Sequence, residues 1–266
     1  MFYSLALAAL TATPAQGGEL KLANVRMTVG ELGPPRASTK FLPGDIVFIG
    51  YDITGLTIEP DGLAKYKMAM EVADGTGKAI FKQDARELTD FVPLRGNTIP
   101  ARAFVTIGLD QDPGNYTCKV TVEDPKTKAK DTLTTKFEVG KSEFGIVAVY
   151  TTHDLKREIS APTTGTVGQS IFINFSVASF QRDPKTKQPN VEFEFQVLDD
   201  KGNPTLGQPG KHVQNSGVDE KAGAFQMQFA LFMSRPGKFT ARVTATDKVA
   251  NKKVSYDLPV TVLPAN

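Results

Sequence analysis

The sequence predicts an all-β protein made of two tandem antiparallel β-sandwiches with seven or eight strands each. Apolar and polar residues alternate with a period of two along many short runs, which is typical of strands that bury one face. Clusters of Asp, Gly, Asn and Pro separate these runs, as expected at hairpin turns. Similar segments also recur at a near-constant spacing, and no segment shows the 3.6-residue stripe of an amphipathic helix.

The predicted strands can be followed along the chain from their inward-facing positions. In order these are Val47, Ile49, Tyr51 and Ile53; Met68, Met70 and Val72; Tyr116, Cys118, Val120 and Val122; Ile171, Ile173, Phe175 and Val177; Phe193, Phe195 and Val197; Phe225, Met227, Phe229 and Leu231; and Phe239, Ala241, Val243 and Ala245. The turns between strands are predicted at DGTGK, EDPKTKAKD, DDKGN and TDKVANKK, which are rich in turn-forming residues.

The two halves of the chain resemble each other segment by segment, with an offset that stays near 124 residues. The matching pairs are Gly18–Val25 with Ser142–Val149, Pro43–Ile53 with Val167–Val177, Met68–Lys78 with Phe193–Asn203, and Pro113–Asp124 with Pro236–Asp247. A period this long indicates whole domains, since solenoid repeats are shorter. We therefore expect an internal duplication, with one domain over residues 19–142 and a second over residues 143–266.

Residues 1–18 differ in composition from the rest and are predicted to be a signal peptide. Phe2 to Ala12 is apolar but too short to span a bilayer, and small residues follow, with a cleavage site expected after Ala15. No Lys or Arg stands at the front, so a disordered or strand-forming tail is the alternative. The sequence thus predicts a secreted, periplasmic or cell-surface protein with no membrane span in the mature chain.

The segment DPGNYTCKV resembles the tyrosine corner of immunoglobulin-like domains, because Tyr116 lies two residues before Cys118. The resemblance implies a hydroxyl that bonds to the backbone just upstream. Cys118 is the only cysteine and the chain has no Trp, so the disulfide and core Trp of antibody domains are absent. The second half has Phe239 and Ala241 at the equivalent positions. The chain therefore resembles disulfide-free fibronectin-III-like and bacterial immunoglobulin-like domains, which implies structural roles for Tyr116, Cys118 and Phe239.

Composition argues against most catalytic and metal chemistry. With 31 basic and 29 acidic residues interspersed, the sequence predicts no nucleic-acid partner. Two histidines, His153 and His212, and one cysteine are too few for a zinc site at the usual spacings, and no cofactor is expected. Both histidines are expected at the surface and Cys118 is expected to be a buried, inert thiol. Asp110, Asp112, Asp199 and Asp200 are candidates for calcium ligation, but turn formation fits their spacing better.

Specificity is expected in irregular segments that differ between the halves. They are GELGPPRASTKFLPG and QDARELTDFVPLRGNTIPAR in the first half, and SFQRDPKTKQPN and GNPTLGQPGKHVQNSG in the second. Phe48, Phe172 and Phe180 are predicted on an outer face, where they form a binding patch or are covered by loops.

The sequence therefore predicts a non-catalytic binding, adhesion or spacer module that engages a protein or polysaccharide of the cell envelope. A carbohydrate-binding module is the alternative, and an enzyme or a calcium-binding domain fits less well. The sequence does not indicate an oligomeric state.

Overall fold

A computed structural model describes residues 19–265 of the chain, and the predicted all-β fold is confirmed. The signal peptide expected in residues 1–18 lies outside this range. The first unit contains β1 (Lys21–Thr28), β2 (Lys40–Phe41), β3 (Ile46–Thr54), β4 (Leu63–Ala73), β5 (Ala79–Phe91), β6 (Thr98–Thr106), β7 (Gly114–Glu123) and β8 (Lys130–Val139). The second contains β9 (Gly145–Thr152), β10 (Thr164–Thr166), β11 (Ser170–Ala178), β12 (Val191–Leu198), β13 (Gly210–Gln214), β14 (Ala224–Phe232), β15 (Gly237–Asp247) and β16 (Lys252–Leu263).

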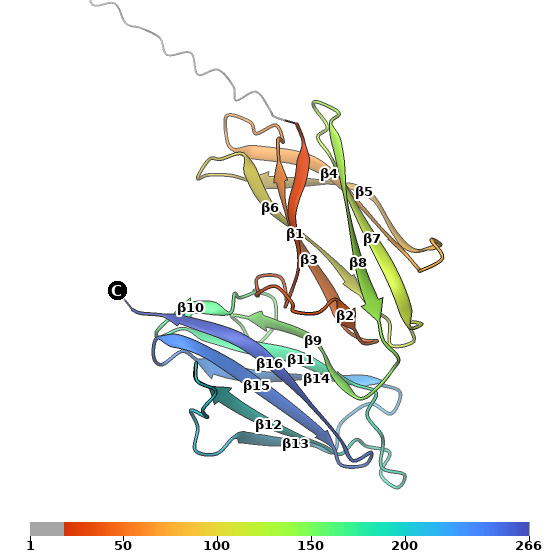
Figure 1. The fold of residues 1–266 in the computed structure, drawn as a ribbon, viewed down its shortest axis with the longest axis vertical. Coiled ribbons are helices and arrows are strands. Elements are labelled where there is room, and N and C mark those ends of the chain that lie inside the picture. Colours follow the sequence, from red (N-terminus) through yellow and green to blue (C-terminus); the bar gives the residue numbers. More distant parts are fainter. Residues whose placement is uncertain (1–18, 266) are drawn as a thin grey trace, which may run out of the picture.

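Each unit is a sandwich of a three-stranded and a five-stranded sheet (Figure 1). The sheets of the first unit have the strand orders β1-β3-β6 and β2-β8-β7-β4-β5. The second unit repeats this arrangement with β9-β11-β14 and β10-β16-β15-β12-β13. Neighbouring strands are antiparallel, except that the short strands β2 and β10 run parallel to β8 and β16.

The two hydrophobic cores lie between the sheets and are built from the period-two positions of the central strands. Alternation places one face of each strand inward, and burying it supplies the main favourable free energy of folding. In the first unit the largest fully buried side chains are Val47, Ile49, Tyr51, Ile53, Val72 and Val120. In the second they are Ile171, Ile173, Phe175, Phe193, Met233 and Leu258.

Of the segments predicted to be irregular, residues 83–102 are mostly strand and residues 202–217 contain one short strand. Residues 83–91 belong to β5 and residues 98–102 to β6, while β13 lies within the segment 202–217. These predictions were wrong because β5 and β13 are edge strands with mostly exposed side chains. An edge strand that packs little against a core has no reason to show an apolar alternation. His212 accordingly lies in β13, and not in a loop.

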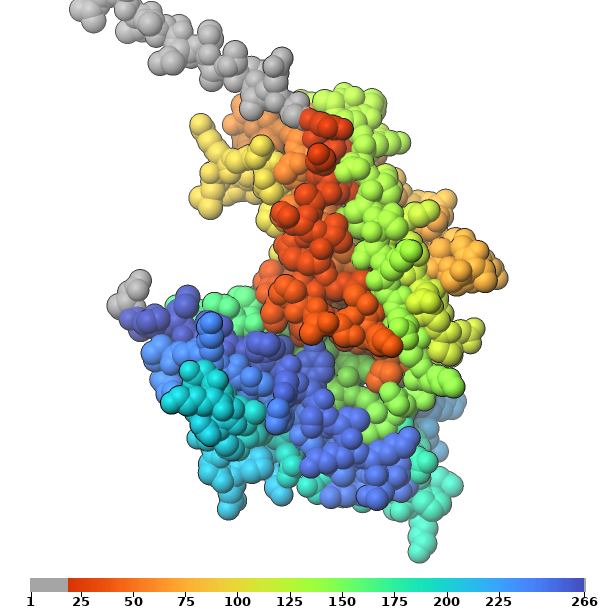
Figure 2. All heavy atoms as spheres, in the orientation of Figure 1, coloured from red at the N-terminus to blue at the C-terminus, as the bar shows by residue number. Residues whose placement is uncertain are grey.

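The two units meet closely, and only residues 140–144 separate β8 from β9. In Figure 2 the orange-red part of the first unit rests on the blue C-terminal strands of the second. Val29 of the first unit belongs to the hydrophobic core of the second. Gly30 has a φ of 69°, and a Cβ at this position would lie 2.8 Å from the Cβ of Tyr150, so the approach of the two backbones requires glycine here.

Asp45 is the buried polar centre of this junction, with 4% of its surface exposed. Its Oδ1 accepts hydrogen bonds from the backbone N–H groups of Ile46 and of Ala148 in the second unit, both at 2.8 Å. Its Oδ2 lies 3.2 Å from the guanidinium of Arg36. Because these contacts join loops of one sandwich to a strand of the other, they restrict the angle between the units.

Candidate functional site

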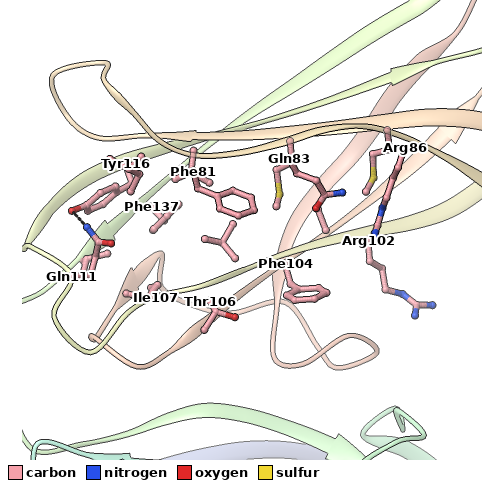
Figure 3. A pocket seen from close by; sticks show the side chains of 17 residues that line it. Phe81, Gln83, Arg86, Arg102, Phe104, Thr106, Ile107, Gln111, Tyr116 and Phe137 are labelled. Atoms are coloured by element: carbon pink, nitrogen blue, oxygen red, sulfur yellow. Dashed lines mark hydrogen bonds between the residues drawn. The ribbon is translucent and has the colours of Figure 1, made fainter. Parts of the chain in front are cut away.

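A hollow of the first unit lies between its two sheets, where the edge strand β5 faces the edge strand β6. We call this hollow the seam cavity; it has a volume of about 460 Å³ (Figure 3). That volume is within the range of pockets that hold small ligands. The sandwich is open here because no strand bridges β5 and β6.

The floor of the seam cavity is apolar and comes from the inner face of the five-stranded sheet. Met68, Met70 and Val72 alternate along β4 and are at most 6% exposed. Tyr116 of β7 and Phe137 of β8 continue the floor, and their rings stack with centroids 5.5 Å apart. The period-two pattern of these strands therefore makes both the core and the floor of the cavity.

The polar part of the wall comes from β5 and depends on a β-bulge. Met70 pairs with Gln83 and Met68 pairs with Arg86, so one extra residue is accommodated on β5 between these pairs. Residues that pair directly across an antiparallel ladder point to the same face. Since Met68 and Met70 point inward, the bulge turns both Gln83 and Arg86 toward the cavity.

The amide of Gln83 is a buried polar group without a partner. Its Nε2 has no hydrogen-bond partner among residues 19–265. Buried donors in folded proteins are nearly always paired, because leaving one unpaired costs about 1–3 kcal/mol. Less than 1 Å² of this nitrogen is accessible, so an acceptor supplied by a ligand would satisfy it once the half-buried side chain turns toward the cavity.

The opposite rim is formed by β6 and carries exposed groups. Arg102 lies 3.2 Å from the carboxylate of Glu31 at the surface. Phe104 is 57% exposed and its ring centroid is 6.4 Å from that of Phe48. Arg102 and Phe104 pair with Gly50 and Phe48, which alternate with the inward-facing Ile49 and Tyr51. Their side chains therefore lie on the outer face of the three-stranded sheet beside the opening, and not in the cavity.

Tyr116 makes the bond that defines a tyrosine corner. Its hydroxyl donates to the backbone oxygen of Asp112 at 2.6 Å and accepts from Nε2 of Gln111 at 2.7 Å. Two residues on, Cys118 is fully buried, and this burial raises the pKa of its thiol to about 12. In the second unit Phe239 keeps the ring without the hydroxyl, and Arg235 lies 4.8 Å above it.

A similar hollow lies at the same place in the second unit, also with a volume of about 460 Å³. Its walls include Phe195 and Val197 of β12, Leu231 of β14, and Phe239. Arg235 is its only charged lining residue.

The three phenylalanines predicted on an outer face do not pair with one another in residues 19–265. Phe48 and Phe172 occupy equivalent half-buried positions on β3 and β11. Phe180 instead packs against the core of the second unit, with its ring 5.0 Å from that of Phe225 and the Arg182 guanidinium 5.1 Å from its centroid. It does not join the others, because the chain turns inward after β11.

The titratable residues singled out in the sequence do not converge. His153 and His212 are exposed, and Cys118 is buried in the other unit. Within residues 19–265 there is no group of three His, Cys, Asp or Glu residues that could hold a metal ion. Asp199 accepts backbone N–H bonds from Lys201 and Asn203, and these bonds hold the pKa of its carboxyl below the usual range.

The same part of the chain contains no helix long and apolar enough to cross a membrane.

The seam cavity is not evident from the sequence. Gln83 and Arg86 lie in a segment predicted to be irregular, and their common direction depends on the bulge in β5. The alternation of Met68, Met70 and Val72 indicated a buried face, but not that part of this face remains uncovered.

No protein-family model matches the sequence, and no curated protein matches it. Among solved structures, the chain is similar to the C-terminal domain of the AgI/II polypeptide BspA of Streptococcus agalactiae, with 8% identity over 91% of this chain and 100% of that domain and a TM-score of 0.28. It is also similar to the Pseudomonas fluorescens alkylpurine DNA glycosylase AlkC bound to DNA containing an abasic site analog. That match has 16% identity over 46% of this chain and only 31% of the glycosylase, with a TM-score of 0.29. At TM-scores this low, neither likeness identifies a family or a ligand for this chain.

Proposed function

We propose that this chain is an exported, non-catalytic binding protein of the cell envelope, and that it takes its ligand in the seam cavity. One observation carries the proposal: an apolar floor lies beside a buried amide donor that has no partner. The residues that line the cavity include no Asp, Glu, His, Lys, Cys or Ser. The only hydroxyls in the lining are those of Thr106 and Tyr116, and no carboxylate, imidazole or amine of the lining stands beside them to act as a base. Such a site is suited to binding and not to acid–base or covalent catalysis.

We further infer that both sandwiches are of the immunoglobulin-like type. The order β1-β3-β6 corresponds to strands A, B and E of that fold, and β8-β7-β4-β5 corresponds to G, F, C and C′. The hydrogen bond from the Tyr116 hydroxyl to the oxygen of Asp112 also supports this assignment. The recurrence of one strand order in both units supports the predicted duplication.

Export rests on the composition of residues 1–18. Expression of the full gene in a bacterial host, followed by mass determination of the envelope and culture fractions, tests it. We expect a product that begins after Ala15. A full-length product that is confined to the cytoplasm would contradict export but leave the proposed binding site untouched.

Binding in the cavity can be tested with N-phenyl-1-naphthylamine, a neutral dye that fluoresces in apolar surroundings. The variant Ala103→Phe places a ring in the cavity from β6, whereas Ala85→Phe adds the same ring on β5 at an exposed position that does not line it. We expect Ala103→Phe to remove a saturable binding site that Ala85→Phe retains, with thermal unfolding to confirm that both variants fold. Equal dye binding by the two variants would contradict the proposal.

Carbohydrate binding remains a second candidate because Phe104 is exposed beside Phe48. The two rings are tilted by 42° and therefore do not form the flat platform on which sugar rings stack. A glycan-array signal that is lost in Phe48→Ala or Phe104→Ala but kept in Ala103→Phe would favour this alternative.

A further inference from the structure

The seam cavity is polarised from one end to the other. In Figure 3 Tyr116, Gln111 and Phe137 lie at one end, whereas Gln83 and Arg86 lie at the other; the side chain of Arg102 points away from the cavity. The hydroxyl of Tyr116 and the amide of Gln111 already bond to each other. The polar groups at the first end therefore have hydrogen-bond partners within the protein, whereas the amide nitrogen of Gln83 at the second end has none.

The second end is positively charged. Arg86 has no ion pair in residues 19–265, whereas Arg102 has one exposed partner in Glu31. Arg102 lies on the outer face of β6, so the charge at this end is that of Arg86, and no acidic residue lines the cavity to offset it. Guanidinium groups pair well with planar carboxylates, and an amide N–H can donate to the same oxygen atoms. The end of the cavity at Gln83 and Arg86 thus matches a carboxylate.

The two edges that frame the cavity are poorly suited to an added peptide strand. Strand addition requires an uninterrupted row of backbone groups. The bulge between Gln83 and Arg86 interrupts this row on β5, and Pro100 removes a donor from β6. A ligand therefore gains little by pairing with backbone and has to enter through its own apolar group.

Building on the proposed binding role, we propose that the seam cavity takes a small amphiphile that consists of a single apolar chain with a terminal carboxylate, the chemistry of a medium-chain fatty acid. The carboxylate lies at Gln83 and Arg86, and accepts from the Gln83 amide and the guanidinium. The chain lies over Met68, Met70 and Val72 toward Phe137. Both the buried unpaired donor and the uncovered apolar floor are satisfied by this one ligand.

The test uses the full chain and three probes of equal length: decanoate, decanol and decylamine, titrated by calorimetry in 150 mM salt below their aggregation limits. We expect decanoate to bind at least tenfold more tightly than decanol, since a charge-assisted hydrogen bond contributes about that factor. Decylamine should bind more weakly than decanol. If decanol binds as tightly as decanoate, carboxylate recognition is refuted while the binding role stands; if none of the three binds, both proposals fall.

Three variants locate the carboxylate. Arg86→Gln and Gln83→Met should each weaken decanoate binding, by about tenfold for Arg86→Gln, and Arg86→Gln should leave decanol binding unchanged. Arg235→Gln removes the only charge from the cavity of the second unit and serves as the matched control, with no change expected. A loss of decanoate binding in Arg235→Gln that is absent in Arg86→Gln would overturn the assigned site.

A peptide arm separates the fatty-acid-like ligand from a protein C-terminus. An acetylated tetrapeptide that ends in two leucines carries the same carboxylate next to apolar side chains, and its C-terminal amide lacks the charge. We expect the acid to bind more weakly than decanoate because neither edge can pair with its backbone. Tighter binding by the peptide acid than by decanoate would refute the proposed ligand class.

Discussion

Removal of the Asp45 carboxylate should destabilise the protein more than removal of any exposed carboxylate. In Asp45→Ala the N–H groups of Ile46 and Ala148 lose their acceptor and Arg36, whose side chain is 14% exposed, loses its counter-charge. Each buried group left unpaired costs about 1–3 kcal/mol, and breaking a buried ion pair typically costs about 3–5 kcal/mol. We therefore expect the free energy of unfolding, measured in urea, to fall by about 3–5 kcal/mol.

The matched control is Asp257→Ala. Asp257 pairs with Arg242 through two short hydrogen bonds of 2.7 and 2.6 Å, but both side chains are more than 40% exposed. Solvent screening keeps such pairs below about 1 kcal/mol despite their geometry. If Asp257→Ala costs as much as Asp45→Ala, burial does not set the energy of these pairs and our reasoning is wrong.

The same carboxyl gives the stability a pH dependence with a defined sign. Burial raises the pKa of Asp45 above its ordinary value of 3.8, against the opposing effects of Arg36 and of the amides of Ala148 and Ile46. The folded state therefore binds this proton more tightly than the unfolded state, so the contribution of Asp45 is largest below pH 3.8 and falls as pH rises through the raised pKa. Relative to Asp45→Asn, the native chain should lose stability across that window; a gain would show that the interactions with the charged form outweigh burial.

Three further outcomes follow from single contacts. Tyr116→Phe removes one hydrogen bond and should lower the free energy of unfolding by about 1 kcal/mol. Tyr116→Ala also leaves a cavity and should lower it by about 3–5 kcal/mol. Equal losses in urea titrations would show that the hydrogen bond, and not the ring, provides the stabilisation. Cys118 should resist iodoacetamide at pH 8 until denaturant is added, since its thiol has a raised pKa and is buried, and rapid alkylation of the native chain would show that the strand opens. Ala148→Gly should raise the free energy of unfolding by about 0.5–1 kcal/mol, and with it the melting temperature, because Ala148 has a φ of 51° that glycine adopts more readily. A lower melting temperature would mean that the methyl group of Ala148 contributes more by packing.

The sequence predicted the central strands well because the burial of one face gives them an alternation of apolar and polar residues. Val47, Ile49 and Tyr51 of β3, and Phe193 and Phe195 of β12, lie on the inner faces, as alternation requires. The turn clusters between β7 and β8 and between β15 and β16 also lie where they were expected. These features are local, since each depends only on whether neighbouring residues face the core or solvent.

The edge strands and the cavity could not be predicted in this way. Gln83 and Arg86 point to the same face only because β5 has a bulge where it pairs with β4. The residues of β5 carry no local pattern that predicts the position of this bulge. The role of Asp45 depends on Ala148, which is 103 residues away along the chain. Such features arise from contacts between elements that are distant in the sequence, and local patterns within one segment do not predict them.

The short connection at residues 140–144 and the buried contacts of Asp45 have a consequence for avidity. The two units present hollows of the same volume, and the junction holds their openings at a restricted separation. A polymer that carries a carboxylate-ended apolar group for the first hollow and an uncharged apolar group for the second, at that separation, would be held at two points, and the second contact would form at a high effective concentration. A flexible linker would allow binding to ligands at many spacings, but with a lower effective concentration for the second contact. The rigid junction instead favours tight binding to ligands at one spacing.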